Sequence, residues 1–333
     1  MIISRTPFRI SFFGGCTDYP VWYEKNGGAT LSTTIDKYCY ITARYYPPFF
    51  PIKHRIVWSK IETVKNDDEI EHPSVRETLK YLGIKKGVEI HHNSDLPARS
   101  GLGSSSSFTV GLLHALYKLL DQPVTKLKLA SDAIHVEQER IKENVGSQDQ
   151  LAAAFGGFNK FTFGGPQKIG VEPIILSDDR LETLQKNLML VFTGFARTAS
   201  EVVVEQLQNT PYKDRELRIM HAMVDDALKI LRAPHQDLSD FGKLLHETWM
   251  LKRSLSSKVT NAEIDNVYES ARRAGAIGGK LLGAGSGGFM LLFVPPERQS
   301  AVHAALKDHL FVPFKFETGG SQIIYHQNSG HLA

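Results

Sequence analysis

Cysteine is scarce in this chain, which has only Cys16 and Cys39 among its 333 residues. A scaffold held together by several disulfides is therefore excluded, and a reducing compartment fits this usage. Neither cysteine has a second ligand nearby at the spacing of zinc sites, so we expect no structural zinc.

Long apolar runs are also absent. No stretch approaches the roughly 20 apolar residues that a bilayer-crossing helix needs. The N-terminal sequence MIISRTPFRISFF is interrupted by Arg5, Pro7 and Arg9, which argues against a signal peptide. We therefore expect a cytoplasmic protein without a membrane partner.

Charge of one sign is not concentrated anywhere. The formal net charge is +3, and no block of five or six like charges occurs. Such a charge distribution predicts no nucleic-acid partner. The length exceeds what one hydrophobic core usually serves, so two domains are expected.

Sequence patterns predict an α+β protein. Residues 1–13, 39–46, 54–60 and 87–93 are typical of strands, and residues 72–83, 108–120 and 126–143 of helices. A buried strand is expected at 188–194, helices over most of 198–275 and at 297–308, and strands at 311–317 and 321–327. We predict two domains, 1–190 and 191–333.

The stretch PARSGLGSSSS (97–107) lies between a strand-like and a helix-like segment, which argues against a flexible linker. Gly101 and Gly103 let the backbone approach a phosphate, and the free N–H groups of a helix N-terminus bind anions. The stretch has no lysine, so it is not a Walker A loop. The residues alone favour a phosphate loop and a plain capped helix about equally.

Two further glycine-bearing segments bear on this choice. PFRISFFGGCTDYP (7–20) predicts a strand and a Gly14-Gly15 turn, after which Asp18 could accept hydrogen bonds from sugar hydroxyls. Taken alone, an ordinary turn aspartate is the better interpretation of Asp18. LLGAGSGGFMLLF (281–293) matches G-x-G-x-x-G, but we expect a helix before it and a strand after it, the wrong context for a dinucleotide fold. A second phosphate-side glycine loop fits it better.

In this order, the three segments resemble the motifs of the GHMP kinase superfamily, which includes galactokinase, homoserine kinase, mevalonate kinase and phosphomevalonate kinase. The central motif Pro-x3-Gly-Leu-x-Ser-Ser, here Pro97 to Ser105, is quite specific, and the resemblance spans nearly the whole chain. It implies a two-domain α+β fold, with an N-terminal domain like ribosomal protein S5 domain 2 and a ferredoxin-like C-terminal domain. ATP, Mg²⁺ and a small-molecule substrate would sit between them.

Within the superfamily, GG-x-TDYP and GSQDQLAAAFGGFN look most similar to bacterial D-glycero-D-manno-heptose 7-phosphate kinases. The resemblance implies phosphorylation of an anomeric hydroxyl on the route to GDP-heptose for surface polysaccharide. Two alternatives stay open: a free-sugar 1-kinase such as a fucokinase, and a catalytically dead nucleotide- or sugar-binding module. The presence of Asp149 and Ser105 favours an active enzyme. Acceptor, anomer and oligomeric state are not fixed by one sequence.

The resemblance also implies roles for individual residues. Asp149 would accept or orient the proton of the attacking hydroxyl, with Arg9 beside it to keep it ionised and to stabilise the transferred phosphoryl group. Without the motif, Asp149 is typical of a helix N-cap and Arg9 of a surface arginine. Ser105 and Glu137 would ligate Mg²⁺, with Glu139 ranked below Glu137.

The expected ATP loop comprises Pro97, Ser100, Gly101, Leu102, Gly103, Ser104, Ser105 and Ser106, and the expected substrate-binding residues are Gly14, Gly15, Thr17, Asp18, Tyr19, Arg197 and Gly285. Ser104, Ser106 and Ser107 are expected to cap the helix or contact phosphate. Arg197 could hold a phosphate of the substrate, or be an ordinary surface residue. Gly15 and Cys16 stand where galactokinase has Glu-His, which argues against galactose. Cys16 also departs from the glycine expected in heptose kinases.

Overall fold

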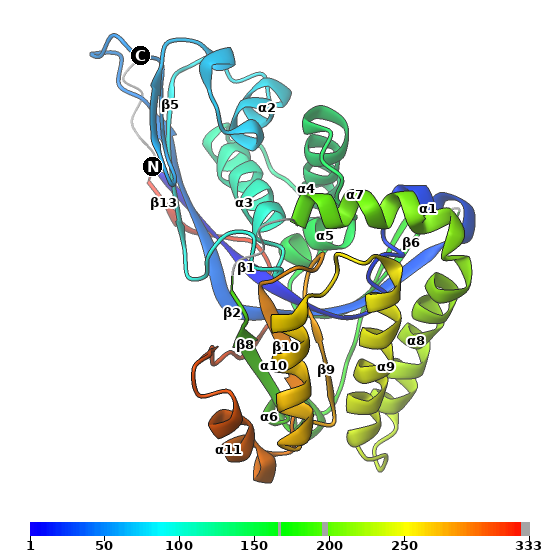
Figure 1. The fold of residues 1–333 in the computed structure, drawn as a ribbon. Helices are drawn as coiled ribbons and strands as arrows, with labels where there is room; N and C mark the ends of the chain where they lie inside the picture. The colour runs from blue at the N-terminus through cyan, green and yellow to red at the C-terminus, as the bar shows by residue number, and fades with distance from the viewer. Residues whose placement is uncertain (166–167, 195–198, 328–333) are drawn as a thin grey trace.

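The computed structural model describes residues 1–165, 168–194 and 199–327, in which helices surround two β-sheets (Figure 1). The larger sheet has nine strands in the described residues, with the main path β13-β1-β2-β5-β3-β4. Strands β12 and β6 also pair with β2, and β7 pairs with β6. The smaller sheet has the order β11-β8-β10-β9. The expected α+β class is confirmed.

The strands are β1 Ile2–Phe13, β2 Gly28–Tyr45, β3 His54–Val57, β4 Ile61–Val64, β5 Val88–Ser94, β6 Phe158–Phe163, β7 Ile169–Pro173, β8 Leu188–Phe192, β9 Gly278–Leu281, β10 Phe289–Phe293, β11 Leu310–Phe311, β12 Phe316–Glu317 and β13 Gln322–His326. The α-helices are α1 Pro20–Asn26, α2 Pro73–Tyr81, α3 Ser104–Leu119, α4 Lys126–Ile134, α5 Gln148–Phe155, α6 Asp178–Lys186, α7 Ala199–Asn209, α8 Asp214–Arg232, α9 Ser239–Leu255, α10 Ala262–Arg273 and α11 Pro296–Ala305. Short helical turns are η1 Asp67–Glu69, η2 His135–Ile141 and η3 Thr210–Tyr212.

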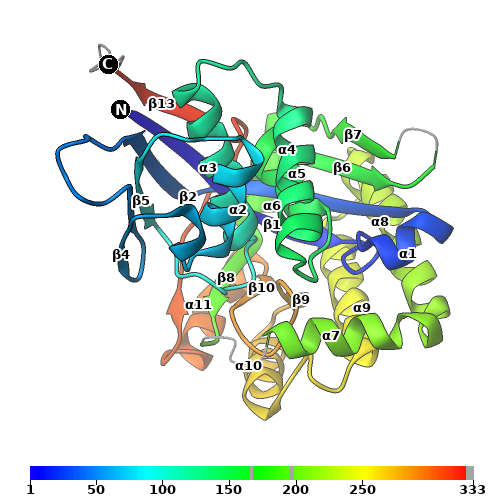
Figure 2. The ribbon, with the colours of Figure 1, turned by 90° about the horizontal axis from the view of Figure 1, so that it is seen from above.

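The long strand β2 organises the larger sheet. It pairs antiparallel with β1 from Ile2–Ala43 to Phe13–Leu31, and its other edge meets β6, β12 and β5 in succession. Helices α2–α5 lie on one side of this sheet, and the smaller sheet with α8–α11 lies on the other (Figure 1). Seen from above, α2–α5 are grouped over the middle of the sheet (Figure 2). Apolar residues from both sheets share a core, to which Leu102 and Leu282 beside the glycine motifs also belong.

Helix α9 joins the two parts of the molecule. The ring of Phe241 on this helix makes edge contacts with Phe12 and Phe13 of β1, with ring centroids 5.4 and 5.1 Å apart. The same helix contacts β9 in the smaller sheet. Because aromatic contacts of this kind stabilise beyond simple burial, the end of β1 is held firmly against the second sheet.

The chain passes between the sheets at β8, which contains the predicted boundary at residue 190. It later returns, because β12 pairs with β2 and β13 pairs with β1 of the larger sheet. The division into 1–190 and 191–333 stays a prediction, and the sheet topology adds that the C-terminal strands belong to the first sheet.

The helix expected at 126–143 is confirmed as α4 and the wider helical turn η2, which ends at Ile141. One local prediction was wrong, because a strand, β9, rather than a helix directly precedes the glycine loop at 283–288. The sequence Gly278-Gly279 has poor strand propensity, but a Cβ at Gly278 would lie 1.8 Å from the carbonyl oxygen of Gly242 in α9. Close packing of the helix on the strand therefore outweighs propensity here.

Candidate active site

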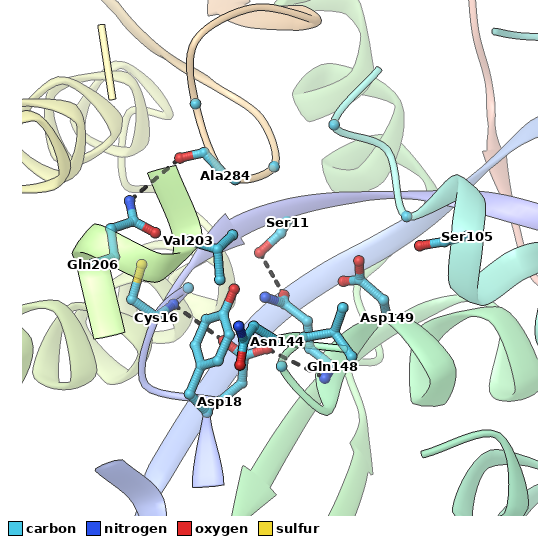
Figure 3. Close-up of a pocket in the computed structure, with 18 of the residues that line it drawn as sticks. Ser11, Cys16, Asp18, Ser105, Asn144, Gln148, Asp149, Val203, Gln206 and Ala284 are labelled. Atoms are coloured by element: carbon cyan, nitrogen blue, oxygen red, sulfur yellow. Dashed lines mark hydrogen bonds between the residues drawn. The ribbon is translucent and has the colours of Figure 1, made fainter. Parts of the chain in front are cut away.

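A cavity of about 600 Å³ is lined by residues from both sheets and from the loops between them (Figure 3). Its walls come from parts of four segments: the turn after β1, the loop before α3 with the first two residues of that helix, the residues before α5 with its first turn, and the glycine loop after β9. Residues of α7 and α9 complete the lining. The lining includes five basic side chains, Arg9, Arg99, Lys142, Lys252 and Lys280, and three acidic ones, Asp18, Glu143 and Asp149. An excess of positive charge in a cleft suits an anionic ligand.

Arg9 and Asp149 form a two-pronged ion pair on this lining. The Nε and Nη2 atoms of Arg9 each donate a 2.8 Å hydrogen bond to one carboxylate oxygen of Asp149. The Nη1 atom of Arg9 donates to the carbonyl oxygen of Gly101 at 2.6 Å. Arg9 therefore connects β1, the loop before α3 and the first turn of α5.

Asp149 is not a helix N-cap, because α5 begins at Gln148 with Ser147 as its N-cap residue. The Arg9 side chain is 6% exposed and that of Asp149 23% exposed, so the carboxylate is held from behind while part of it faces the cavity. Such a carboxylate has a fixed orientation and access to a ligand, which general-base chemistry requires.

The two glycine loops pack directly against each other. Gly101 has a φ of 83°, and a Cβ there would lie 2.5 Å from the carbonyl oxygen of Leu282. A Cβ on Gly283 would lie 2.4 Å from the Cα of Gly101. The amide of Phe289 also donates to the carbonyl oxygen of Ser100 at 3.0 Å. The second glycine loop therefore supports the first from behind, and the close approach requires glycine on both sides.

The four consecutive serines have different surroundings. Ser104 and Ser105 line the cavity. Ser106 donates to Glu137 at 2.8 Å and Ser107 to the carbonyl oxygen of Pro7 at 3.0 Å, and both are buried. The N-cap residue of α3 is Gly103, and no side chain caps this helix. The serines therefore do not cap α3, and a contact of theirs with phosphate stays a prediction. The first N–H groups of an α-helix have no partner within the helix, so they can bind an anion.

Some expected ATP-loop residues lie off the cavity. Of the expected set, Gly101, Gly103, Ser104 and Ser105 line it. Pro97 is exposed outside it, whereas Ser100, Leu102 and Ser106 are buried behind it. The middle of the motif thus lies on the cavity, whereas its buried residues pack behind the loop.

Glu137 is buried and 1% exposed, behind the start of α3. Its Oε2 atom accepts hydrogen bonds from Ser106 and Gln150, and its Oε1 atom has no partner among the described residues. Burial raises its pKa to about 7, against hydrogen bonds that lower it. Glu139 is on the solvent side, where it pairs with His135 at 2.8 Å. An unsatisfied buried carboxylate oxygen suits a hard cation, so Glu137 fits a Mg²⁺ site better than Glu139 does.

No cluster of three or more His, Cys, Asp and Glu side chains arranged to hold a metal occurs within the described ranges. Mg²⁺ commonly binds through one or two protein groups, substrate phosphates and water, so this donor set is still compatible with it.

The turn after β1 supplies the opposite wall of the cavity. Asp18 is 1% exposed and accepts hydrogen bonds from the amides of Cys16 at 3.1 Å and Gln148 at 3.4 Å (Figure 3). Burial and the nearby charge of Asp149 raise its pKa to about 6. Gly15, Asp18 and Tyr19 line the cavity, as does Gly285 on the far side.

Thr17 and Gly14 hold the turn together instead of facing the cavity. The Thr17 hydroxyl donates to the carbonyl oxygens of Gly14 at 2.7 Å and Ala29 at 3.0 Å. A Cβ on Gly14 would lie 1.9 Å from the Ala29 oxygen. Neither residue lines the cavity, so the expectation that they contact substrate is not supported. Cys16 adopts a φ of 76°. The backbone at this position therefore has the left-handed conformation that favours glycine, although the residue is cysteine.

Two lysines and one glutamine of the site were missed by the sequence analysis. Lys252 near the end of α9 and Lys280 in β9 both line the cavity. Gln148 accepts a 2.7 Å hydrogen bond from Ser11 and also lines it (Figure 3). A lysine near a helix C-terminus is usually exposed, so the pattern around Lys252 carried no signal. The position of Lys280 directly before the glycine loop was a signal that could have been used.

Arg197, predicted to hold a substrate phosphate, lies outside the described residues. In the part of the chain that the structure describes, no helix combines the length and apolar character needed to span a membrane.

Comparison with known proteins identifies related chains. Residues 72–157 match the family model described as GHMP kinases N terminal domain, and residues 223–311 match GHMP kinases C terminal. A D-glycero-alpha-D-manno-heptose 7-phosphate kinase of Campylobacter jejuni is 30% identical over 324 residues, which cover 92% of this chain and 93% of that protein.

Two other relatives differ in what their names say they act on. The Arabidopsis thaliana bifunctional fucokinase/GDP-fucose pyrophosphorylase is 24% identical over 91% of this chain and 31% of its own length. The crystal structure of a D-glycero-D-manno-heptose 1-phosphate kinase from Bacteriodes thetaiotaomicron has a TM-score of 0.78 at 24% identity, covering 98% of this chain and 100% of that one.

Proposed function

This chain belongs to the GHMP kinase family, and from that premise we propose that it transfers phosphate from ATP to the anomeric hydroxyl of a sugar phosphate, D-glycero-D-manno-heptose 7-phosphate. The two-domain GHMP kinase fold expected from the sequence is confirmed. A sugar-kinase activity is typical of its relatives, and the particular acceptor is our proposal.

One observation carries this proposal: the Arg9–Asp149 pair lies on a cavity lined on one side by the Gly101–Ser105 loop and on the other by Asp18 and Tyr19. The first wall suits phosphates, because it joins glycine backbone to a helix N-terminus. The second wall suits a polyol, because it offers a carboxylate and a phenol. A carboxylate between a donor site and an acceptor site is where phosphoryl transfer requires one.

In the proposed reaction, Asp149 accepts the proton of the anomeric hydroxyl as its oxygen attacks the γ-phosphorus of ATP. The bond from this phosphorus to the β,γ-bridging oxygen breaks, and ADP leaves with the electron pair. Arg9 fixes the orientation of the carboxylate through both of its oxygens. Because Arg9 also holds the carbonyl of Gly101, a shift of the nucleotide loop would be transmitted to the base.

Ser105 and Glu137 are the residues we assign to Mg²⁺. Ser105 presents a hydroxyl on the cavity, and Glu137 has one unpaired buried oxygen near the same helix start. When bound, the metal would offset negative charge on the ATP phosphates. Both residues offer oxygen donors, which this cation prefers.

The acceptor is tested by an ADP-release assay with ATP and Mg²⁺ across heptose 7-phosphate, mannose 6-phosphate, fucose and galactose, with NMR locating the new phosphate. We expect the highest kcat/KM with heptose 7-phosphate and a product phosphorylated at C1. Activity confined to fucose would favour the free-sugar kinase, as the fucokinase relative suggests. Nucleotide binding without turnover of any sugar would favour a dead binding module.

A further inference from the structure

Two buried lysines face the cavity beside the acceptor wall. Lys252 is 4% exposed and Lys280 is 3% exposed, and both line the cavity. Lys252 comes from α9 and Lys280 from β9, so packing of the helix on this strand brings the two ammonium groups to one place. Lysine is rarely buried to this extent without a charged partner.

Neither lysine has a carboxylate partner within ion-pair distance in the described part of the chain. The Nζ atom of Lys280 donates to the carbonyl oxygen of Phe12 at 2.9 Å. The Nζ atom of Lys252 donates to the carbonyl oxygens of Leu281, at 2.8 Å, and of Gly283. Since an ammonium group has three N–H donors, these bonds fix both groups and leave donors free for a ligand.

Burial and repulsion between like charges disfavour the charged forms of both lysines, and a bound anion would offset both effects. Burial, with a smaller contribution from the charge of Arg9, lowers the pKa of Lys252 to about 8. Burial and then the charge of Lys252 lower the pKa of Lys280 well below its ordinary value. Two like charges in a desolvated site are costly, and a bound anion would stabilise both.

Resting on the proposed function, we propose that Lys252 and Lys280 bind the phosphate group that the sugar acceptor already carries. A phosphomonoester is close to a dianion at neutral pH and offers three acceptor oxygens, which matches two cations with free donors. The ammonium groups are already removed from water and fixed by backbone carbonyls, so less ordering is needed when the phosphate binds.

The position of Lys280, beside Lys252, favours the acceptor phosphate over a phosphate of ATP. The charged or ionisable neighbours that act on Lys280 are Lys252, Cys16, Arg9 and Asp18. Cys16 and Asp18 belong to the turn that forms the acceptor wall, whereas the nucleotide loop presents Ser104 and Ser105. This assignment uses only described residues and does not depend on Arg197.

Variants of the pair separate the two phosphate sources. In Lys252→Gln and Lys280→Gln, the amide can still donate to a carbonyl but has no charge. We expect the KM for heptose 7-phosphate to rise at least tenfold, with the KM for ATP changed less than twofold. Lys243→Gln, on the exposed part of α9, is the matched control and should change neither. A rise in the KM for ATP alone would assign the lysines to the nucleotide and overturn the proposal, as would no change in either KM.

A binding measurement keeps the proposal testable if these variants fold poorly or if the acceptor is another sugar. In wild-type protein with ¹³C-labelled lysine, inorganic phosphate should raise the pKa of both lysines, as followed by their Cε resonances. ATP should not prevent this, whereas a phosphorylated acceptor should compete with phosphate. Unshifted Lys252 and Lys280 resonances at saturating phosphate would overturn the proposal. Because this measurement does not depend on turnover, it can contradict the phosphate site while the proposed kinase function still holds. Likewise, it can support the phosphate site even if the proposed acceptor is wrong.

Discussion

Arg9 and Asp149 are 140 positions apart in the sequence, and the structure pairs them through two hydrogen bonds of 2.8 Å. A third bond from Arg9 reaches the Gly101 carbonyl oxygen. This geometry fixes a carboxylate between the loop assigned to ATP and the turn assigned to the sugar. The first two predictions concern this pair.

We expect Asp149→Asn to lower kcat by about 10²- to 10⁴-fold, because an amide cannot accept the hydroxyl proton. The amide oxygen still accepts one bond from Arg9, so the free energy of unfolding should fall by only about 1 kcal/mol. Coupled ADP assays measure kcat, and thermal melts measure the change in stability. Asp68→Asn, at a carboxylate that is 85% exposed, is the control. Near-normal turnover in Asp149→Asn would remove Asp149 from the mechanism.

Arg9→Lys keeps the charge but loses the fork that contacts both carboxylate oxygens and Gly101. We expect kcat/KM to fall about 10- to 100-fold, because the Asp149 carboxylate would no longer be held in its orientation. The double variant Arg9→Lys with Asp149→Asn should be little worse than Asp149→Asn alone, because the two residues act as a unit. Fully multiplicative losses would show that Arg9 acts independently of Asp149.

Gly283→Ala should destabilise the protein and weaken ATP binding, because its Cβ would lie 2.4 Å from the Cα of Gly101. We expect a loss of about 2–4 kcal/mol of unfolding free energy, from a left-handed φ and a backbone clash together. Gly83→Ala is a matched control, since its φ is 64° with nothing within 4 Å of the added carbon, and should cost about 1 kcal/mol. Denaturant unfolding and ATP titration measure both effects. Equal losses in the two variants would mean that the loop contact contributes little.

Glu137→Gln should raise the Mg²⁺ concentration needed for half-maximal activity, because it removes the charge from a buried carboxylate with one unpaired oxygen. We expect a shift of about tenfold, while Glu139→Gln should leave the Mg²⁺ requirement unchanged, since Glu139 pairs with His135 at the surface. Activity measured against Mg²⁺ at fixed ATP tests this. The opposite ranking of the two variants would transfer the metal role to Glu139.

The KM for the phosphorylated acceptor should rise as the pH passes above about 8. Burial lowers the pKa of Lys252 to about 8, so this lysine loses its proton through this range and with it its attraction for a dianion. Around this lysine, Asp18 has a pKa raised to about 6 and is already ionised in this range, and burial raises the pKa of Cys16 to about 11. The KM should be measured from pH 6.5 to 9, with an unphosphorylated sugar for comparison. A flat profile for the phosphorylated acceptor would contradict this prediction.

The same lowered pKa of Lys252 affects stability in the opposite direction: the free energy of unfolding rises with pH. The unfolded chain binds more protons at Lys252 than the folded protein does between pH 8 and 10.5, so this group's contribution to unfolding free energy increases with pH over that range. Deprotonation of Lys252 should therefore weaken phosphate binding while it raises its own contribution to the free energy of unfolding. A rise in KM without a loss of stability would thus distinguish weaker phosphate binding from general alkaline unfolding.

Short-range patterns in the sequence determined the α+β class and the main elements. Apolar spacing predicted α3, and β-branched and aromatic residues predicted β1, because periodicity depends on which face each residue presents. The glycine motifs were also readable, since a left-handed φ or a close backbone approach restricts a position to glycine, as at Gly101 and Gly283.

Contacts between distant segments were decided only by the tertiary structure. It directs Ser106 toward Glu137 and away from the cavity, makes Thr17 support its turn, and forms β9 from a Gly-Gly segment because α9 packs closely against it. It also brings Lys252 and Lys280 together from a helix and a strand. The local sequence does not predict such long-range contacts. The burial of these residues and the closeness of their charges arise only when the two sheets and α9 pack together.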